Sequence, residues 1–374
     1  MEVPEGMVLE GILAVNKPAH VSSAEVLEKL QATFASSQIY APLLRTQPKR
    51  TSKSDGQVFR MGHGGTLDPL AAGVLIVGIG RGTKQLQKYL ACTKSYETTV
   101  LFGASTDSYD CTGVVTERAN CAHVTRTLVE AQLAQFRGTI SQAPPIYSAL
   151  KIDGKKACEY VRNGQALPRQ LESRGMLVDE CMLLEWYEAG QHVLQYPGEE
   201  KPATAPAARI RLTVCSGFYV RSFAHDLGIA CQSRSHMATL LRTRQASYTT
   251  QDPPDSPDLT TAITYADIDG GEGVWGPKIR PQLEAWVLAN PMARGHVNGR
   301  SEEARRRKAT VEGERPKQRF RGGYVADTKK ERIKQQGGKY KGKWGRKSTT
   351  GGPVHDKAAS VEETVEASVD QAAV

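Results

Sequence analysis

A glycine-rich segment holds the carboxylate that is best placed for chemistry in this chain. Residues 62–73 read Gly-His-Gly-Gly-Thr-Leu-Asp-Pro-Leu-Ala-Ala-Gly, with Asp68 directly before a proline. Proline disfavours helix at the preceding residue, and the glycines let another backbone approach closely. The apolar run 74–79 that follows predicts a buried strand. Asp68 could therefore face a ligand, or it could cap the turn before the strand, and the spacing alone leaves both open.

Four more segments combine polar, aromatic and cationic side chains at fixed spacing. They are residues 94–97 followed by 102–113, 143–151 followed by 154–164, 215–228, and 236–244. Taken singly, none of their residues identifies a site. A strand tyrosine such as Tyr96 usually packs on a core, and an arginine such as Arg221 usually forms a surface ion pair. The order of the segments therefore carries more information than any single residue.

The elements expected to position these segments are short strands and helices. Residues 9–15 predict a strand, and Ser22 with Glu25 predicts a capping box for the helix that follows. Residues 94–102 and 209–214 alternate in hydropathy, as half-buried strands do. Because no regular strand–helix–strand repeat is visible, the pattern favours an α+β domain.

Three further helices and two insertions complete the expected organisation. Thr83 and Thr127 are predicted to cap two of these helices, and residues 219–227 are predicted to form the third. Residues 35–57 are polar and residues 189–207 are rich in glycine, proline and alanine. Both stretches are predicted to be exposed insertions.

The positive charge of the chain is concentrated in its C-terminal tail. Residues 1–290 contain 29 basic and 29 acidic side chains, residues 291–350 contain 19 and 6, and residues 351–374 contain 1 and 5, which gives net charges of 0, +13 and −4. The tail lacks apolar periodicity, so residues 291–374 are predicted to be disordered. Its basic and aromatic residues suit nonspecific RNA binding, a nuclear localisation signal or a plain linker, and these readings have equal weight.

Composition also argues against several classes of protein. No stretch approaches the roughly 20 apolar residues of a membrane span. The first six residues resemble neither a signal peptide nor a transit peptide. None of the 7 cysteines forms a C-x-x-C pair, so a reduced intracellular compartment without a metal site is expected. The sequence contains neither a P-loop nor a dinucleotide-binding fingerprint, so no nucleotide cofactor is expected.

Taken in order, the segments resemble the signature of the TruB family of pseudouridine synthases. Residues 62–73 are similar to its G-H-x-G-x-L-D-P-x-A-x-G motif, and 94–97 with 102–113 to its K-x-Y strand and T-D-T-x-D turn. The other segments are similar to the family's P-x-x-Y-S-A-x-K, G-T-Y-I-R and L-R-R-T-R motifs. The resemblance covers residues 9–247. It implies a pseudouridine-synthase fold with a mixed central sheet and a TruB-type insertion, formed by residues 1–290, and no PUA domain is recognisable in the tail.

The resemblance implies roles for particular side chains. Asp68 would be the catalytic carboxylate, in a pocket that excludes water, and Arg221 would keep it ionised there. Tyr96 would stack on the uracil and is the candidate base for the C5 proton. The expected substrate contacts are His63, Tyr219, Leu240, Lys17 and Lys151, of which Lys17 is either structural or phosphate-facing.

Three positions depart from the family motifs. Ser108 stands where a threonine is usual, and Phe218 lies in a loop that is shortened before the family's tyrosine. Leu241 replaces the first arginine of the L-R-R-T-R motif, so the contact of that arginine is not expected here.

The expected activity is the isomerisation of a uridine in the T-loop of tRNA, at position 55. No metal or cofactor is required, and the expected partners are the T-arm of tRNA and, as further candidates, mRNA stem-loops, bound by a monomer. The tail indicates the nucleus, with the mitochondrion and cytoplasm left open. The alternatives are a guide-RNA-dependent rRNA enzyme, an RNA chaperone and a general RNA-binding protein.

Overall fold

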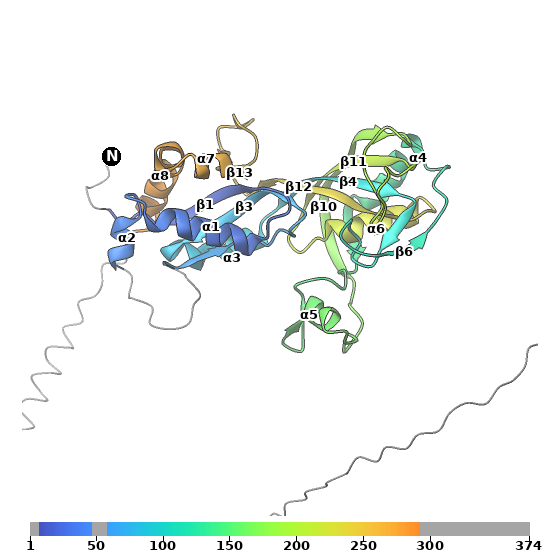
Figure 1. The fold of residues 1–374 in the computed structure, drawn as a ribbon, viewed down its shortest axis with the longest axis horizontal. Coiled ribbons are helices and arrows are strands. Elements are labelled where there is room, and N and C mark those ends of the chain that lie inside the picture. Colours follow the sequence, from blue (N-terminus) through green and yellow to red (C-terminus); the bar gives the residue numbers. More distant parts are fainter. Residues whose placement is uncertain (1–6, 47–57, 292–374) are drawn as a thin grey trace, which may run out of the picture. The chain divides into compact units, whose positions relative to one another are not determined.

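A mixed sheet of 10 strands forms the centre of the described structure. The computed structural model describes residues 7–46 and 58–291 (Figure 1). The main strands, in their order across the sheet, are β1 Gly11–Lys17, β3 Ala72–Ile79, β12 Ser235–Gln245, β4 Lys94–Phe102, β11 Ala207–Val214, β10 Arg174–Tyr187 and β7 Gly138–Gln142. At the side of this path, β2 Met61–His63 pairs with β3, and β13 Tyr248–Thr249 joins β12 to β14 Thr260–Thr261.

One parallel contact in an otherwise antiparallel path makes the sheet mixed. Leu241 and Arg242 of β12 pair in parallel with Ala72 and Gly73 of β3, whereas the other main neighbours are antiparallel. This confirms the α+β prediction with a mixed central sheet. The contact also sets the loop before β3, which contains Asp68, beside β12.

Helices cover the sheet, and two small hairpins lie outside it. The helices are α1 Ser23–Ala35, α2 Ala41–Thr46, α3 Leu86–Ala91, α4 Arg126–Leu133, α5 Ala157–Arg162, α6 Val220–Ala230, α7 Tyr265–Asp269 and α8 Glu272–Ala289, with 3-10 turns η1 Gly80–Gln85 and η2 Ala134–Phe136. The hairpins are β5 Ala104–Thr106 with β6 Val115–Arg118, and β8 Lys151–Ile152 with β9 Lys155–Lys156.

Two large hydrophobic cores both include residues of the loop before β3, Leu67 and Ala71 in the first and Leu70 in the second. In the first, α1 and α8 pack near β1, with the rings of Phe34 and Trp275 4.8 Å apart. In the second, α4 and α6 cover β4 and β11, and Phe136 meets Phe223 edge to face at 5.1 Å. Leu240 packs against both cores, so β12 joins the two halves of the sheet (Figure 1).

Several predicted elements are confirmed. Ser22 and Glu25 form the expected capping box at the start of α1, with both reciprocal hydrogen bonds present. The strand predicted over residues 94–102 is β4, and the strand predicted over 209–214 lies within β11. The helix predicted over residues 219–227 is α6, which begins one residue later.

The predicted caps of two helices are wrong. Thr83 lies inside η1, where its hydroxyl donates to the carbonyl of Gly80, and α3 begins at Leu86 without a side-chain cap. The residue that caps α4 is Thr125, which accepts from the amide of Leu128, and Thr127 lies in the first turn. α3 therefore continues directly from η1 without a side-chain cap, whereas α4 has a threonine cap two residues before the predicted one.

The predicted exposed insertions are wrong in part. In the first, Ile39, Tyr40 and Leu43 are buried around α2 and join the first core. Residues 47–57 lie outside the described residues. In the second, Tyr196 is buried and its hydroxyl donates to the carbonyl of Phe102 at 2.7 Å. Both stretches therefore cover apolar surface despite their composition.

The C-terminal part of the folded region contains helices that the sequence analysis did not predict. α7 and α8 span Tyr265–Asp269 and Glu272–Ala289, and Pro277 and Pro281 lie within α8. Proline usually interrupts a helix, yet α8 continues through both prolines. The predicted tail, apart from residue 291, lies outside the described residues. No described helix has the length and hydropathy that a membrane span requires.

Asp226 on α6 is a half-buried carboxyl whose titration should make the stability of the fold depend on pH. Burial raises the pKa of Asp226 to about 6, and the carboxylate has no hydrogen-bond or ion-pair partner among the described residues. The folded state therefore holds this proton more tightly than the unfolded chain, where an aspartate has a pKa of about 3.9. The contribution of this protonated carboxyl to the free energy of unfolding is therefore complete below about pH 4, and it is lost as the pH rises through about 6.

We expect Asp226→Asn to unfold at a higher temperature than the wild type at about pH 7.5 and at nearly the same temperature at about pH 4. Thermal unfolding followed by circular dichroism across this range measures the effect. Asp258→Asn changes an exposed aspartate and should keep the wild-type pH profile. If Asp226→Asn also keeps that profile, Asp226 does not titrate as described.

Candidate active site

One cleft of about 1000 Å³ gathers most of the residues singled out by the sequence analysis. Its lining includes the three expected catalytic residues Asp68, Tyr96 and Arg221, and the expected substrate contacts His63, Tyr219 and Leu240. These side chains come from the loop before β3, from β2, β4 and β12, and from the start of α6. Segments up to about 170 residues apart in the chain therefore share one cavity.

The guanidinium of Arg221 organises the centre of this cleft. Its Nε lies 3.0 Å from Oδ2 of Asp68 and 3.7 Å from Oδ2 of Asp110. Its terminal nitrogens donate to the carbonyls of Ser108 at 3.1 Å and Tyr147 at 2.8 Å. The planar fork thus holds two carboxylates and two carbonyls in one arrangement, which a single ammonium group could not do.

The two carboxylates beside Arg221 differ in exposure. The side chain of Asp110 is 5% exposed, whereas that of Asp68 is 39% exposed. Oδ1 of Asp110 accepts from the hydroxyls of Ser108 and Thr112 and from the amide of Thr112. Asp110 is therefore a fixed part of the protein, whereas Asp68 points into the cleft. The expectation that the pocket itself excludes water from Asp68 is wrong, because the cleft is open on that side.

Hydrogen bonds from the segment between β1 and α1 and from the first residue of α1 hold the loop that contains Asp68 in place on one side. The hydroxyl of Ser23 both donates to the carbonyl of Leu67 at 2.9 Å and accepts from its amide at 3.0 Å. The amide of His20 donates to the carbonyl of Pro69 at 2.7 Å. The start of α1 therefore fixes the residues on both sides of Asp68.

Arg242 and Gln245 of β12 hold the same loop from the other side. Arg242 is buried and donates to the carbonyls of Val74 at 2.7 Å and Gly65 at 3.0 Å. The amide of Gln245 donates to the carbonyl of Gly64 at 2.7 Å. At Gly73 (φ +108°) an added Cβ would lie 2.2 Å from the carbonyl oxygen of Arg242, so β3 and β12 can approach only because this residue is glycine.

Lys17 is not a substrate contact, which corrects one expectation. It is fully buried, and its ammonium donates to the carbonyls of Pro18, Val21 and Pro69 at 2.9, 2.6 and 3.2 Å. Burial lowers the pKa of Lys17 to about 8, although the nearby Asp68 opposes that effect. Of its two predicted roles, the structural one holds, because its ammonium is occupied by two carbonyls of the turn after β1 and by the carbonyl of Pro69, next to Asp68.

Lys151 also lies away from the cleft. It is exposed at the start of β8, and it does not line the cavity that contains Asp68. Lys156 and Arg162, in the same motif, do line this cavity. The β8–β9 hairpin turns the chain between these positions, so the cationic contribution of the motif comes from residues later in it than the sequence predicted.

The apolar and aromatic walls lie where stacking on a base would require them. Tyr96 is 8% exposed on β4, and Leu240 on the neighbouring strand β12 pairs with Thr98, so the two side chains lie on the same face of the sheet and both line the cleft. His63 lines the same cavity, and its buried Nδ1 has no hydrogen-bond partner among the described residues. Burial, with a smaller contribution from Arg242, lowers the pKa of His63, so the imidazole is neutral at physiological pH.

Gln142 is a positioning residue that the sequence analysis missed. It is buried at the end of β7, where its side-chain oxygen accepts from the amide of Tyr219 at 2.8 Å and its nitrogen donates to the carbonyl of Tyr219 at 3.1 Å. Tyr219 is the residue before α6, and Arg221 lies in the first turn of that helix. One amide therefore fixes the point at which the shortened loop enters the helix that carries Arg221.

We expect Gln142→Leu to lower the free energy of unfolding by about 1–3 kcal/mol, because it leaves the amide of Tyr219 without a partner, whereas the carbonyl of Tyr219 still accepts from the amide of Phe223. Urea unfolding measures the loss. Gln135→Leu removes an exposed amide that bonds only Gln132, and it should change stability little. Equal stability of the two variants would show that the backbone at Tyr219 finds other partners.

The functional residues that the sequence analysis missed lie in or next to the motif segments, but the sequence does not show that they belong to the site. Asp110 and Gln142 lie within or beside the quoted segments, and Arg242 lies in the fifth. Nothing in the order of residues shows that Asp110 turns towards Arg221 or that Arg242 is buried. A polar residue of any of these types is usually exposed, so only the packing identifies their roles.

Comparison with known proteins agrees with the geometry. Residues 50–220 match the model of the TruB family pseudouridylate synthase (N terminal domain). The chain is 34% identical over 328 residues to "tRNA pseudouridine synthase 4" of Schizosaccharomyces pombe, in a match that covers 65% of this chain and 80% of that protein. It is 37% identical over 213 residues to "tRNA pseudouridine synthase B" of Bacteroides thetaiotaomicron, covering 57% and 82%.

Among solved structures, the "Crystal Structure of a Cbf5-Nop10-Gar1 Complex" matches with a TM-score of 0.43 and 23% identity, over 69% of this chain and 54% of that one. The sequence relatives are both more similar and more completely covered than this structure. From them, and from the family model, the chain belongs to the TruB family of pseudouridine synthases, isomerases that modify uridines in tRNA.

Proposed function

We propose that this enzyme isomerises the uridine at position 55, in the T-loop of tRNA, with Asp68 as its catalytic carboxylate. The observation that carries the proposal is the pairing of Asp68 with Arg221 at 3.0 Å in a cleft walled by Tyr96 and Leu240. The printed names of the most similar proteins, which are tRNA pseudouridine synthases, support tRNA as the substrate.

The target uridine must leave its stack before it can enter this cleft. Extruding a base costs on the order of a few kcal/mol, which contacts in the pocket offset. Tyr96 offers a ring on one side of the base and Leu240 an apolar surface on the other, and the neutral imidazole of His63 lies in the same cavity. The partly exposed carboxylate of Asp68 is then covered by the nucleotide itself.

The reaction rearranges bonds within one nucleotide. The C1′–N1 bond breaks, the uracil turns, a C1′–C5 bond forms, and the proton on C5 is lost while N1 gains one. No electrons are exchanged with another molecule. Asp68 can begin this sequence in two ways, by attacking C1′ or by removing the 2′ proton, and the proposal includes both.

In this proposal Arg221 acts in the first step, with Asp68, and Tyr96 acts in the last step, the loss of the C5 proton. The guanidinium keeps Asp68 charged and oriented when the nucleotide has displaced water, because an ionised carboxylate buried without a cation would be strongly destabilised. The hydroxyl of Tyr96 is the candidate acceptor for the C5 proton, a role that rests on its position in the cleft.

The wider biology of the enzyme is part of the same proposal. Stem-loops of mRNA that imitate the T-loop would present the same extruded uridine and are proposed as additional substrates. The basic clusters 305–308 and 319–324 favour the nucleus as the main compartment. Nothing in the arrangement of the cleft calls for a guide RNA, so we propose a stand-alone, monomeric enzyme.

We expect Asp68→Asn to bind a bare tRNA transcript with nearly wild-type affinity and to form no pseudouridine, because the amide keeps the shape of the side chain but not its charge. Mapping of pseudouridine in the transcript after incubation with each form measures the effect. Product at the T-loop uridine without any guide RNA supports the proposed specificity. Product at another uridine contradicts the specificity, and normal turnover by the variant contradicts the role of Asp68.

We expect Asp110→Asn to lower kcat by about 10-fold or more while leaving the affinity for tRNA almost unchanged. The amide keeps the turn formed with Ser108 and Thr112, but it removes the second negative charge beside Arg221. Single-turnover kinetics measure the rate. A melting temperature near that of the wild type confirms folding, and an unchanged rate would show that Asp68 alone orients the guanidinium.

A further inference from the structure

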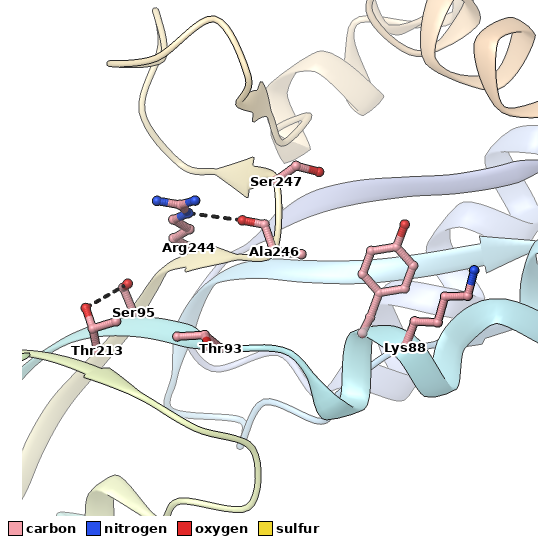
Figure 2. A pocket seen from close by; sticks show the side chains of 8 residues that line it. Lys88, Thr93, Ser95, Thr213, Arg244, Ala246 and Ser247 are labelled. Atoms are coloured by element: carbon pink, nitrogen blue, oxygen red, sulfur yellow. Dashed lines mark hydrogen bonds between the residues drawn. The ribbon is translucent and has the colours of Figure 1, made fainter. Parts of the chain in front are cut away.

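A second cavity, of about 630 Å³, lies outside the catalytic cleft. It is bounded by α3, by the first residues of β4, by the end of β11 and by the turn after β12, as Figure 2 shows. The side chains that matter in it are Lys88, Tyr89, Ser95, Thr213, Arg244 and Ser247. None of these residues lines the cleft that contains Asp68.

Strand register places this cavity on the other face of the sheet from the catalytic tyrosine. Ser95 of β4 is paired with Thr213 on one side and Arg244 on the other. Tyr96, the next residue, is paired with Leu212 and Arg242. Successive residues of a strand point to opposite faces, so the row through Ser95 and the row through Tyr96 face opposite ways at the same end of the sheet.

The two cations of the second cavity have no counterion. The Nε of Arg244 donates to the carbonyl of Ala246 at 3.0 Å, and Figure 2 shows its terminal nitrogens turned away from that bond. Neither Arg244 nor Lys88 forms an ion pair with any carboxylate in residues 7–46 or 58–291. Elsewhere on this sheet face such pairs are present, for example between Arg211 and Glu97 at 3.1 Å.

The remaining groups of the cavity suit the other parts of a nucleotide. Ser95 donates to Thr213 at 3.1 Å, because the hydrogen of the Thr213 hydroxyl is directed to Glu180. Both hydroxyl hydrogens are therefore used, and the oxygens keep lone pairs that can accept from a ribose hydroxyl. Tyr89 is half-buried, packs on Tyr248 at 6.3 Å and has a hydroxyl without a described partner. Glu180 accepts from Thr213 at 3.0 Å and closes that side to an anion, so a phosphate would lie at the opposite end, between the cations.

We propose that this cavity binds the sugar–phosphate backbone of the tRNA substrate, at a point away from the loop held in the catalytic cleft. Unpaired cations with neighbouring hydroxyls and an aromatic ring are the groups that bind RNA backbone without reading its sequence. The proposal rests on tRNA as the substrate. An RNA bound at Asp68 reaches this cavity around the ends of the strands, which places the contact outside the T-loop.

The structure also fixes this cavity relative to the catalytic loop. The side-chain nitrogen of Gln245 donates both to the carbonyl of Tyr89, in the cavity wall, and to that of Gly64, in the loop before Asp68, at 2.9 and 2.7 Å. A Cβ on Gly64 would lie 3.0 Å from Cβ of Tyr89, so α3 packs closely on that loop. Two segments of one RNA bound at both sites would therefore be held at a constant separation.

The test is the affinity of the full-length double variant Lys88→Ala/Arg244→Ala for two RNAs, the whole tRNA transcript and an isolated T-arm hairpin. For the whole tRNA we expect Kd to rise by about 10-fold and the slope of log Kd against log salt to fall by about one for each lost phosphate contact. For the hairpin we expect much smaller changes. The charge-conserving variant Lys88→Arg/Arg244→Lys should keep most of the wild-type salt dependence.

The matched control is Arg126→Ala/Arg280→Ala, which removes the same two charges from exposed positions on α4 and α8. If tRNA binding by the cavity variant equals that of this control, the proposal is wrong. It is also wrong if the hairpin loses as much affinity as the whole tRNA. Pseudouridine formed by the wild type in the same transcripts tests the proposed function separately, because the site of the product does not depend on either outcome.

Discussion

The centre of this enzyme depends on one guanidinium that holds two carboxylates of different exposure. Arg221 is buried at the start of α6, with Asp110 fixed beneath it and Asp68 reaching past it into the cleft. A buried cation between two anions is stable only when its geometry is nearly complete, because each missing contact leaves an uncompensated charge. The carbonyls of Ser108 and Tyr147 provide the remaining contacts, so the arginine can neither move nor be exchanged for lysine without loss.

Several buried polar side chains around the site hold the backbone next to Asp68 and next to Arg221 in place. On the side of Asp68, Lys17 donates to the carbonyl of Pro69 and Arg242 to that of Gly65, so both charged groups hold the loop that contains Asp68. On the side of Arg221, Gln142 fixes the backbone at the entry to α6. A reaction that breaks a glycosidic bond needs its carboxylate placed to within a fraction of an ångström. A rigid frame around a partly exposed Asp68 meets that need while leaving the nucleotide room to enter.

The mixed sheet explains how one domain can hold the pair of Asp68 and Arg221 rigidly and still present a cavity on each of its two faces. Its single parallel contact on the main path brings the loop before β3 against β12, and β4, on the other side of β12, presents Tyr96 to one face and Ser95 to the other. The first face lines the cleft that contains Asp68 and Arg221. The second is polar at this end, with the cations Lys88 and Arg244 that no described carboxylate neutralises. This asymmetry suits an enzyme whose substrate is far larger than the single nucleotide it changes.

Local pattern was sufficient for some elements of this protein and not for others. The strands at residues 94–102 and 209–214, the capping box of Ser22 and the helix after Tyr219 depend on periodicity and on contacts a few residues apart, which a sequence displays directly. The helix α8 was missed because its prolines oppose helix locally, whereas burial of Trp275 in the first core favours it through contacts with distant residues. The burial of Tyr40 and Tyr196 was also missed, because it too depends on contacts with residues distant in the sequence.

The sequence by itself determined which residues belong to the site: the family motifs identified Asp68, Tyr96, Arg221, His63, Tyr219 and Leu240, and all six line one cleft. Only the tertiary structure decided what each polar group faces. It turned Lys17 inward, moved Lys151 away from the cleft and made Asp110 the second partner of Arg221. The physical reason is that the identity and spacing of residues are properties of the chain, whereas the direction of a side chain depends on which distant strand lies beside it.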